Sequence, residues 1–265
     1  MRESKKFRRN LLATLQADQP YCVYCCGSTL GDTVDHIPPI TVFDLRRRPK
    51  GFEFLSCGMC NRGSKATDQV IGCISRVYPD ASSPQARIEL GKILRGVKNN
   101  HPGLLEEMLP SAEQERRFRR HADKVPDAGG ALNVNGPLLN AAINSFAGKF
   151  GLAMHFYRTK RIVPVSGCIG VRWYSNYDAL VGTLPLEFLK ILAPPETLVQ
   201  GRFEVPDQFS VSFVVTTEGG LSGHFATFRK SFAIVAIAAE DETKLDLDTV
   251  PSSHRIRPGW LKSNN

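Results

Sequence analysis

Long hydrophobic runs and leader-like segments are both missing from this sequence. No apolar stretch approaches the roughly 18 residues that a membrane-spanning helix needs. The start, MRESKKFRRNLLATLQ, has no apolar core followed by small residues, so it does not match a secretory signal. We expect an ordinary first helix there, capped by Ser4. These absences exclude a membrane-spanning class, and we expect a cytoplasmic protein with no membrane partner.

Internal repeats and low-complexity tracts are also absent. Acidic residues are fewer than basic ones, 26 against 34, and the net charge is +8. A polyanion is therefore a natural partner, although the charge balance alone does not separate nucleic acid from an anionic membrane surface. With 42% hydrophobic and 23% charged residues among 265, the composition is that of a globular protein with ample material for a core.

The seven cysteines are unevenly distributed. Five of them lie within residues 22–60, while Cys73 and Cys168 stand alone and are predicted to behave as small core hydrophobes. A secreted disulfide framework would more often use an even number in a shorter chain. Clustered cysteines in a chain without a secretory signal instead indicate a metal.

Two C-x-x-C pairs account for four of the clustered cysteines. Cys22 and Cys25 form the first pair, and Cys57 and Cys60 repeat the same spacing. Because the tight turn at each pair directs both sulfurs to one point, the two pairs can deliver four thiolates to a tetrahedral Zn²⁺. Cys26 is an alternative to Cys25, but the spacing favours Cys25. The sequence therefore predicts a structural zinc site.

The segment TVDHIPPI lies between the two pairs. Residues 33–37 alternate as in a short strand, and Pro38 and Pro39 end it. Asp35 and His36 are neighbours on this strand, so their side chains point to opposite faces. A carboxylate suits a hard metal ion, and an imidazole beside it suits a base that activates water. A loop, a second strand in GFEFLSC and a helix over residues 61–78, ended by Pro79, are expected to follow.

This order of motifs resembles the HNH endonuclease family, the zinc-clasped branch of the ββα-metal nucleases. The resemblance covers about residues 20–75, and its matching residues are Cys22, Cys25, Asp35, His36, Ile37, Pro38, Cys57, Cys60, Asn61 and Lys65. It implies that His36 is the general base and that Asp35 and Asn61 hold one catalytic Mg²⁺ or Mn²⁺. It also implies that Lys65 lies near the scissile phosphate of a nucleic acid, with double-stranded DNA as the expected substrate.

One position departs from the family pattern. Phe52 stands where the middle Asn of the motif is expected, and Glu53 is its nearest polar neighbour. In the family this Asn braces the loop between the strands, a role that Glu53 or the two prolines can take instead. The alternative interpretation is a zinc-stabilised nucleic-acid-binding protein whose nuclease site is inactive.

Basic residues are candidates for contacts with phosphate. LRRRPKG places several in the loop between the strands, and one more follows Asn61, so the candidate nucleic-acid-binding residues are Arg46, Arg47, Arg48, Lys50 and Arg62. A solvated charge run explains them equally well. For a second cluster in EQERRFRRH, on a helix with a capping box of Ser111 and Gln114, an exposed helix face is the preferred interpretation.

The sequence as a whole predicts an α+β fold with three parts. These are the nuclease module with its first helix in residues 1–80, a helical connector in 81–130, and an α+β domain of unassigned role in 131–265. The connector begins with a helix capped by Ser83, and the last part contains a helix from Pro137 to about Lys160. The segments FSVSFVVTT, GHFATFRK and SFAIVAIAA predict an antiparallel sheet, with a hairpin turn in TEGGLSG. This domain is a possible binding site for a protein partner.

Overall fold

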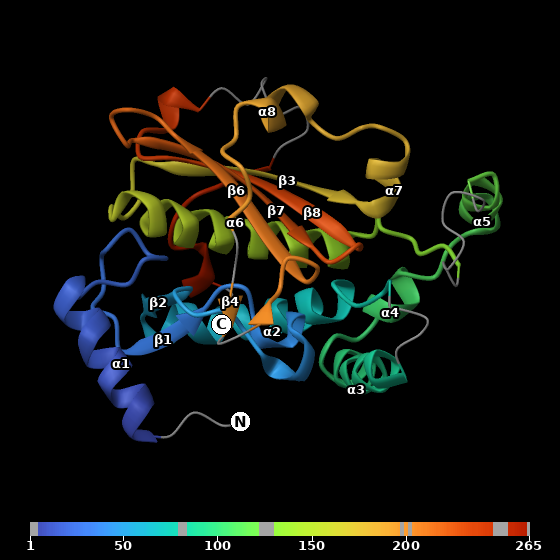
Figure 1. Ribbon diagram of the computed structural model, residues 1–265, viewed down its shortest axis with the longest axis horizontal. Coiled ribbons are helices and arrows are strands. Elements are labelled where there is room, and N and C mark those ends of the chain that lie inside the picture. The colour runs from blue at the N-terminus through green and yellow to red at the C-terminus, as the bar shows by residue number, and fades with distance from the viewer. Residues whose placement is uncertain are drawn as a thin grey trace.

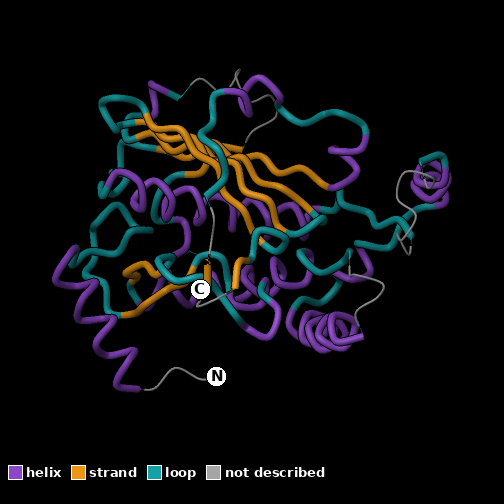
Figure 2. Tube along the Cα trace, in the orientation of Figure 1, coloured by secondary structure: helices purple, strands orange, loops and turns teal. Residues whose placement is uncertain are grey.

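The computed structural model describes residues 5–78, 84–121, 130–196, 199–200, 203–245 and 254–263. Ser4, Pro79 and Ser83, which were expected to begin or end helices, lie outside the described residues. Among the described residues, no helix is both long enough and apolar enough to cross a membrane. The fold mixes helices with an antiparallel sheet, as predicted (Figures 1 and 2).

The N-terminal part has the predicted order of strand, loop, strand and helix. After α1 (Lys5–Asp18), strand β1 (Thr33–His36) pairs antiparallel with β2 (Glu53–Ser56), and helix α2 (Gly58–Ile74) follows at once. Two short 3₁₀ turns, η1 (Ile40–Val42) and η2 (Asp44–Arg46), lie in the loop between the strands. Helix α2 begins three residues earlier than predicted, because Cys57 is its N-cap and the second cysteine pair forms its first turn.

Three helices then lead to the second half of the chain: α3 (Pro84–Asn100), α4 (Leu104–Glu107) and α5 (Ala112–Arg119). The capping box of α5 is confirmed, since the Gln114 N–H donates to Ser111 Oγ and the Ser111 N–H donates to Gln114 Oε1. Arg117 and Arg119 pair with glutamates one turn earlier on the exposed helix surface. Such exposed pairs contribute about 1 kcal/mol or less, and the cluster lies on an exposed helix face, as preferred.

The C-terminal part is a five-stranded antiparallel sheet with one long helix. The strand order is β6-β7-β8-β3-β9, from β3 (Cys168–Ser175), β6 (Phe209–Val215), β7 (Leu221–Phe228), β8 (Phe232–Ala239) and β9 (His254–Ile256). Val215 pairs with Ser222, so the predicted hairpin turn joins β6 and β7. The smaller elements are α7 (Asn176–Leu180), α8 (Leu186–Lys190), β4 (Val199–Gln200), β5 (Phe203–Glu204), η4 (Glu242–Lys244) and η6 (Trp260–Lys262).

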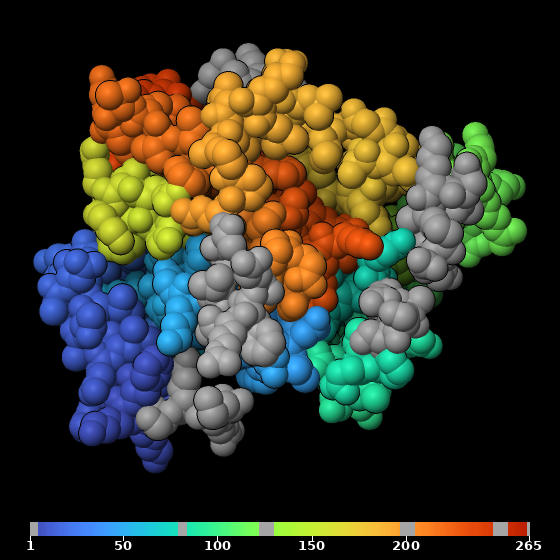
Figure 3. Space-filling model, in the orientation of Figure 1, coloured from blue at the N-terminus to red at the C-terminus, as the bar shows by residue number. Residues whose placement is uncertain are grey.

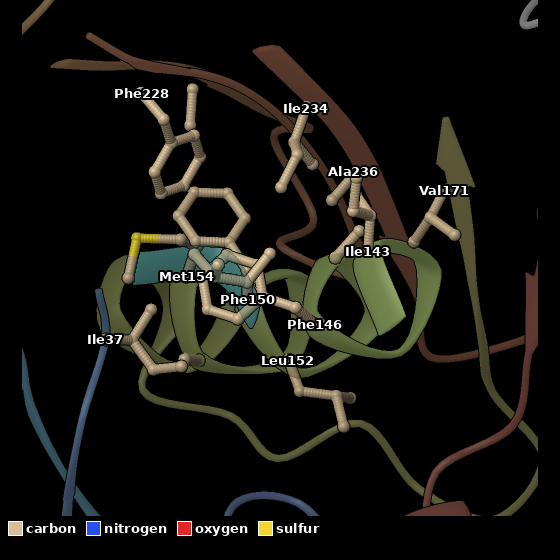
Figure 4. Packing of buried hydrophobic residues seen from close by; sticks show 14 of the residues in the cluster. Ile37, Ile143, Phe146, Phe150, Leu152, Met154, Val171, Phe228, Ile234 and Ala236 are labelled. Carbon is tan, nitrogen blue, oxygen red and sulfur yellow. The ribbon is translucent and has the colours of Figure 1, made fainter. Parts of the chain in front are cut away.

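Helix α6 (Pro137–Thr159) lies between this sheet and the N-terminal part, and it contacts both β8 and α2 (Figure 1). The rings of Phe146 and Phe150 lie 5.7 and 6.4 Å from the ring of Phe228 on the sheet (Figure 4). Gly151 permits the close approach, because a Cβ there would lie 2.8 Å from Ile169 of β3. In Figure 3 the blue N-terminal segments lie directly against the yellow-green end of the α6 region.

One buried apolar cluster therefore extends through the molecule. It includes Ile37 after β1, Val70 of α2, Phe150 of α6 and Phe228 of the sheet. The division at residues 80 and 130 stays a prediction. Because this core is shared, a substitution in α6 is expected to disturb the packing of both the sheet and the N-terminal part.

Two buried histidines predict how stability depends on pH. His224 Nε2 lies 2.9 Å from Ser222 Oγ, and His155 Nδ1 lies 2.8 Å from the same oxygen. Burial lowers the pKa of His224 to about 3, with His155 and Arg158 adding to the shift. Burial also lowers the pKa of His155, although Glu240 opposes that shift.

Replacing His224 with glutamine is expected to make the protein less sensitive to acid. In the unfolded chain this histidine is protonated as the pH falls through about 6.5, whereas in the folded protein it stays neutral until about pH 3. Between about pH 7.5 and 5.5 the free energy of unfolding should therefore fall by about 1.4 kcal/mol more in the wild type than in His224→Gln. Urea unfolding at the two pH values measures this difference, and equal pH dependence in the two proteins would contradict it.

Candidate metal centre and adjacent site

The four predicted cysteines converge at one point. The sulfurs of Cys22, Cys25, Cys57 and Cys60 all lie within 4.8 Å of one another, and all four residues are buried. Zn–S bonds of about 2.3 Å in a tetrahedron require sulfurs about 3.8 Å apart, which this spacing accommodates. The cluster can hold a metal ion such as zinc. Cys26 is not part of it, is only half-buried and has a φ of 57°, which supports the choice of Cys25.

Backbone hydrogen bonds close the turn of the first cysteine pair and attach it to β2. The Val23 N–H donates to the Leu55 carbonyl of β2 at 3.1 Å, and the Cys22 N–H donates to the Thr29 carbonyl at 2.9 Å. The second pair begins α2, directly after β2. A metal at this point would therefore hold the start of α2 against the strand pair.

The C-terminal turn η6 covers the same centre, which the sequence did not indicate. Lys262 Nζ donates to Thr29 Oγ1 at 2.8 Å, and the Gly259 N–H donates to the Tyr24 carbonyl at 3.0 Å. Gly63 of α2 lies so near this turn that a Cβ there would be 2.1 Å from the Leu261 carbonyl oxygen. The end of the described chain thus contributes to the cysteine-bearing part of the fold.

Asp35 lies buried on the side of β1 that faces α6. Its carboxylate accepts a hydrogen bond from Tyr24 Oη at 2.7 Å, and Lys149 Nζ of α6 lies 3.0 Å from its Oδ2. Burial raises the pKa of Tyr24, so the phenol keeps its proton and donates a hydrogen bond to the carboxylate. The same Lys149 nitrogen lies 3.1 Å from both carboxylate oxygens of Asp68 on α2.

Lys149 is a completely buried cation. Burial by itself lowers the pKa of Lys149, but the charges of Asp35 and Asp68 outweigh that effect and raise the pKa above its ordinary value. The ammonium group therefore stays charged. Asp35, which was expected to hold a divalent ion, is in this structure the partner of an internal cation.

Asn61 is brought to the Asp35 side of the strand. Its amide nitrogen donates to Thr33 Oγ1 at 3.0 Å, and Thr33 shares a face of β1 with Asp35 because the two are separated by one residue. This bond engages the nitrogen of Asn61 and not its carbonyl oxygen. Lys65 lies exposed one turn further along α2.

His36 occupies the opposite face of β1 and is half-buried. Its Nε2 lies 3.3 Å from a guanidinium nitrogen of Arg48, and its Nδ1 has no hydrogen-bond partner among the described residues. Burial first, and then the charge of Arg48, lower the pKa of His36 to about 4, while Asp35 opposes the shift. The imidazole is therefore neutral near pH 7. Because a guanidinium only donates, Nε2 accepts the hydrogen bond from Arg48 and the proton of the neutral ring lies on Nδ1.

The remaining candidate residues differ in exposure. Arg46, Arg47, Lys50 and Arg62 are exposed, whereas Arg48 is half-buried beside His36. This placement leaves both interpretations open for the exposed residues, phosphate contact or a solvated charge run. Arg48 is the member of the set that lies against another candidate residue.

The loop between the strands is braced without an Asn at position 52. Glu53 Oε2 accepts a hydrogen bond from the Gly51 N–H at 2.8 Å, which is the bracing role considered for it. From the other half of the chain, Arg229 donates to the Val42 carbonyl and to Asp44 Oδ1. Phe52 itself is buried and stacks on Tyr157 with ring centroids 5.1 Å apart.

Sequence reasoning missed Tyr24, Asp68 and Lys149. Asp68 follows Asn61 by two helical turns and so lies on the same face of α2, a relation that helical periodicity could have shown. Lys149 is a lone charge within the apolar run SFAGKFGLAMHF, and a lysine in such a run needs a buried partner. Which carboxylates it would meet was not readable from the sequence.

The chain was also compared with known proteins. No protein-family model, no curated protein and no solved structure matches it. The resemblance to the HNH nucleases therefore rests on the motif residues themselves and on the order of strand, loop, strand and helix in which they lie.

Proposed function

We propose that this protein is a metal-dependent endonuclease of the HNH type, which hydrolyses phosphodiester bonds in nucleic acid and carries a structural zinc ion. The observation that carries the proposal is the placement of a neutral His36 next to Asp35 on a strand that the cysteine cluster connects to α2. Double-stranded DNA is the proposed substrate, in keeping with the net charge of +8.

In this proposal Arg48, whose guanidinium lies 3.3 Å from His36 Nε2, turns from that nitrogen to the phosphate of the substrate. The freed Nε2 of the neutral imidazole then accepts a proton from the attacking water. The donor set on the opposite face of β1 suits a hard cation, since Asp35 and Asp68 already hold an ammonium group through four oxygens. Bound by Asp35 and Asn61, Mg²⁺ or Mn²⁺ would stabilise charge on the phosphate and on the leaving 3′ oxygen.

The second candidate is a zinc-stabilised protein that binds nucleic acid without cleaving it. The ion pair between Asp35 and Lys149 favours it, because an ammonium group occupies the oxygens that a divalent ion would use. The exposed arginines and lysines would then supply affinity for phosphate without chemistry.

Replacing His36 with alanine is expected to lower plasmid cleavage by about 10²–10⁴-fold, the usual contribution of a general base. The assay compares the wild type with His36→Ala in the presence of Mg²⁺ or Mn²⁺, and His254→Ala, at an exposed histidine of β9, is the matched control. Binding of a labelled duplex is measured in parallel and should be similar in all three proteins.

The results separate the two candidates. Cleavage that survives the loss of His36 argues against its role as base, and so does an equal loss in His254→Ala. Duplex binding without cleavage under either metal favours the binding protein. Cleavage that needs His36 and a divalent ion supports the nuclease.

A further inference from the structure

Two carboxylates from different elements meet at one buried nitrogen. Lys149 Nζ lies 3.0 and 3.2 Å from the two oxygens of Asp35 on β1, and 3.1 Å from each oxygen of Asp68 on α2. The Lys149 side chain is 1% exposed and that of Asp35 is 7% exposed. Four oxygen atoms therefore surround a cation that comes from the C-terminal half of the chain.

These are also the atoms that a divalent ion would need. Mg²⁺ and Mn²⁺ prefer carboxylate oxygens, and Mg²⁺ binds them at about 2.0–2.1 Å, so the oxygens would have to approach one another as the ammonium left. Burial raises the pKa of Asp68 to about 7, and a divalent cation between the two carboxyl groups would favour its ionised form. The divalent ion cannot share the site with the ammonium of Lys149, because two cations about 3 Å apart repel strongly in a mostly buried site.

The position of Lys149 connects this site to the rest of the fold. Helix α6 packs against β3 and β8 on one side and against α2 on the other. Withdrawal of the ammonium therefore requires a shift of α6 or of the Lys149 side chain within a close-packed core. A partner that stabilises the shifted arrangement would open the site, because a ligand changes such an equilibrium only through its differential affinity for the two states.

We infer that Asp68 belongs to the divalent-cation site together with Asp35, and that Lys149 is an internal competitor which keeps this site closed. The inference rests on the proposed function for its biological meaning, since it describes the regulation of the same site. Compared with the proposed function, it adds Asp68 of α2 as a metal ligand and Lys149 of α6 as an inhibitory residue. The structure then represents the form in which the divalent-cation site is closed.

The test measures Mn²⁺ binding to the 265-residue chain, folded in the presence of zinc, through the loss of the free Mn²⁺ electron paramagnetic resonance signal. Lys149→Met is expected to bind one Mn²⁺ about tenfold or more tightly than the wild type. Adding Asp68→Asn to Lys149→Met should remove that gain. Lys190→Met, which deletes an equal charge from the exposed surface of α8, should bind Mn²⁺ as the wild type does.

Binding to Lys149→Met no tighter than to the wild type overturns the inference, and so does a gain that Asp68→Asn leaves intact. Removal of Lys149 leaves the buried carboxylate of Asp35 and the partly buried one of Asp68 without their partner. Lys149→Gln, which keeps an N–H donor toward both, therefore provides the same comparison if Lys149→Met does not fold. If neither variant folds, Mn²⁺ added during refolding must raise the folded yield. A yield that Mn²⁺ does not change overturns the inference.

The binding measurement is independent of catalysis, so the two proposals fail separately. If Lys149→Met binds Mn²⁺ tightly but no variant cleaves plasmid, the closed cation site stands and the nuclease proposal fails. If the wild type cleaves in a manner that needs His36, while Lys149→Met gains no affinity for Mn²⁺, the nuclease proposal stands and the inhibitory role of Lys149 fails.

Discussion

Replacing Cys25 with serine is expected to abolish zinc binding and unfold the strand pair and α2, whereas the same change at Cys26 should do neither. Cys25 is one of four sulfurs that lie within 4.8 Å of one another, while Cys26 lies outside that cluster and is half-buried. Structural zinc sites have apparent binding free energies of about 10–16 kcal/mol, and this energy is also folding energy. Loss of the bound zinc ion would therefore remove about as much free energy as the whole stability of a single domain, which is about 5–15 kcal/mol.

Two measurements check this expectation. Metal analysis should find about one zinc per chain in the wild type and in Cys26→Ser, and much less in Cys25→Ser. Far-ultraviolet circular dichroism and limited proteolysis should show loss of structure only in Cys25→Ser. If Cys26→Ser loses zinc and Cys25→Ser keeps it, the assignment of the ligand is wrong, and zinc-free wild type that stays fully folded would contradict a structural role for the metal.

The cysteine cluster was predictable because it depends on local chemistry. Each C-x-x-C pair is a tight turn that directs two sulfurs to one point, so spacing alone suffices once two such pairs are present. The strand, loop, strand and helix between and after them follow from alternation, from Pro38 and Pro39, and from the apolar stripe of α2. The error at the start of α2 has a physical reason, since Cys57 caps the helix and the cysteine pair itself forms the first turn.

The contacts that define the surroundings of Asp35 were not predictable in the same way. Lys149 is far from Asp35 in the chain, and only the packing of α6 against α2 brings its ammonium to the carboxylate. The same holds for Arg229, which donates to the Val42 carbonyl in the loop between the strands. Such pairs depend on tertiary packing, and a single sequence contains no periodicity or spacing that encodes them.

These long-range contacts also give the C-terminal half a role in the site. Lys149 neutralises part of the charge at Asp35, Arg229 braces the loop that carries Arg48, and η6 covers the cysteine cluster. The N-terminal motif therefore shares its core and its hydrogen bonds with the C-terminal half. Its geometry depends both on the turns that carry the cysteines and on α6 with its sheet.

Introducing the Asn that the HNH family has at the position of Phe52, by Phe52→Asn, is expected to destabilise the protein and not to improve its activity. Phe52 is 2% exposed, stacks on Tyr157 at 5.1 Å and meets Phe209 edge-on at 6.1 Å. Removal of a buried phenyl ring costs about 3–5 kcal/mol, and a buried amide without partners costs about 1–3 kcal/mol more. Urea unfolding should therefore show a loss of about 4 kcal/mol or more.

The matched control is Phe52→Leu, which keeps an apolar side chain and should lose only about 1–2 kcal/mol. The bracing that the family assigns to Asn is already supplied by Glu53, whose carboxylate accepts the Gly51 N–H, so the new amide has no vacant role to take. Plasmid cleavage by Phe52→Asn should therefore be no greater than that of the wild type at a temperature where both are folded. A variant that cleaves faster and keeps its stability would instead show that position 52 is a damaged motif position, and that the aromatic contact with Tyr157 is incidental to the fold.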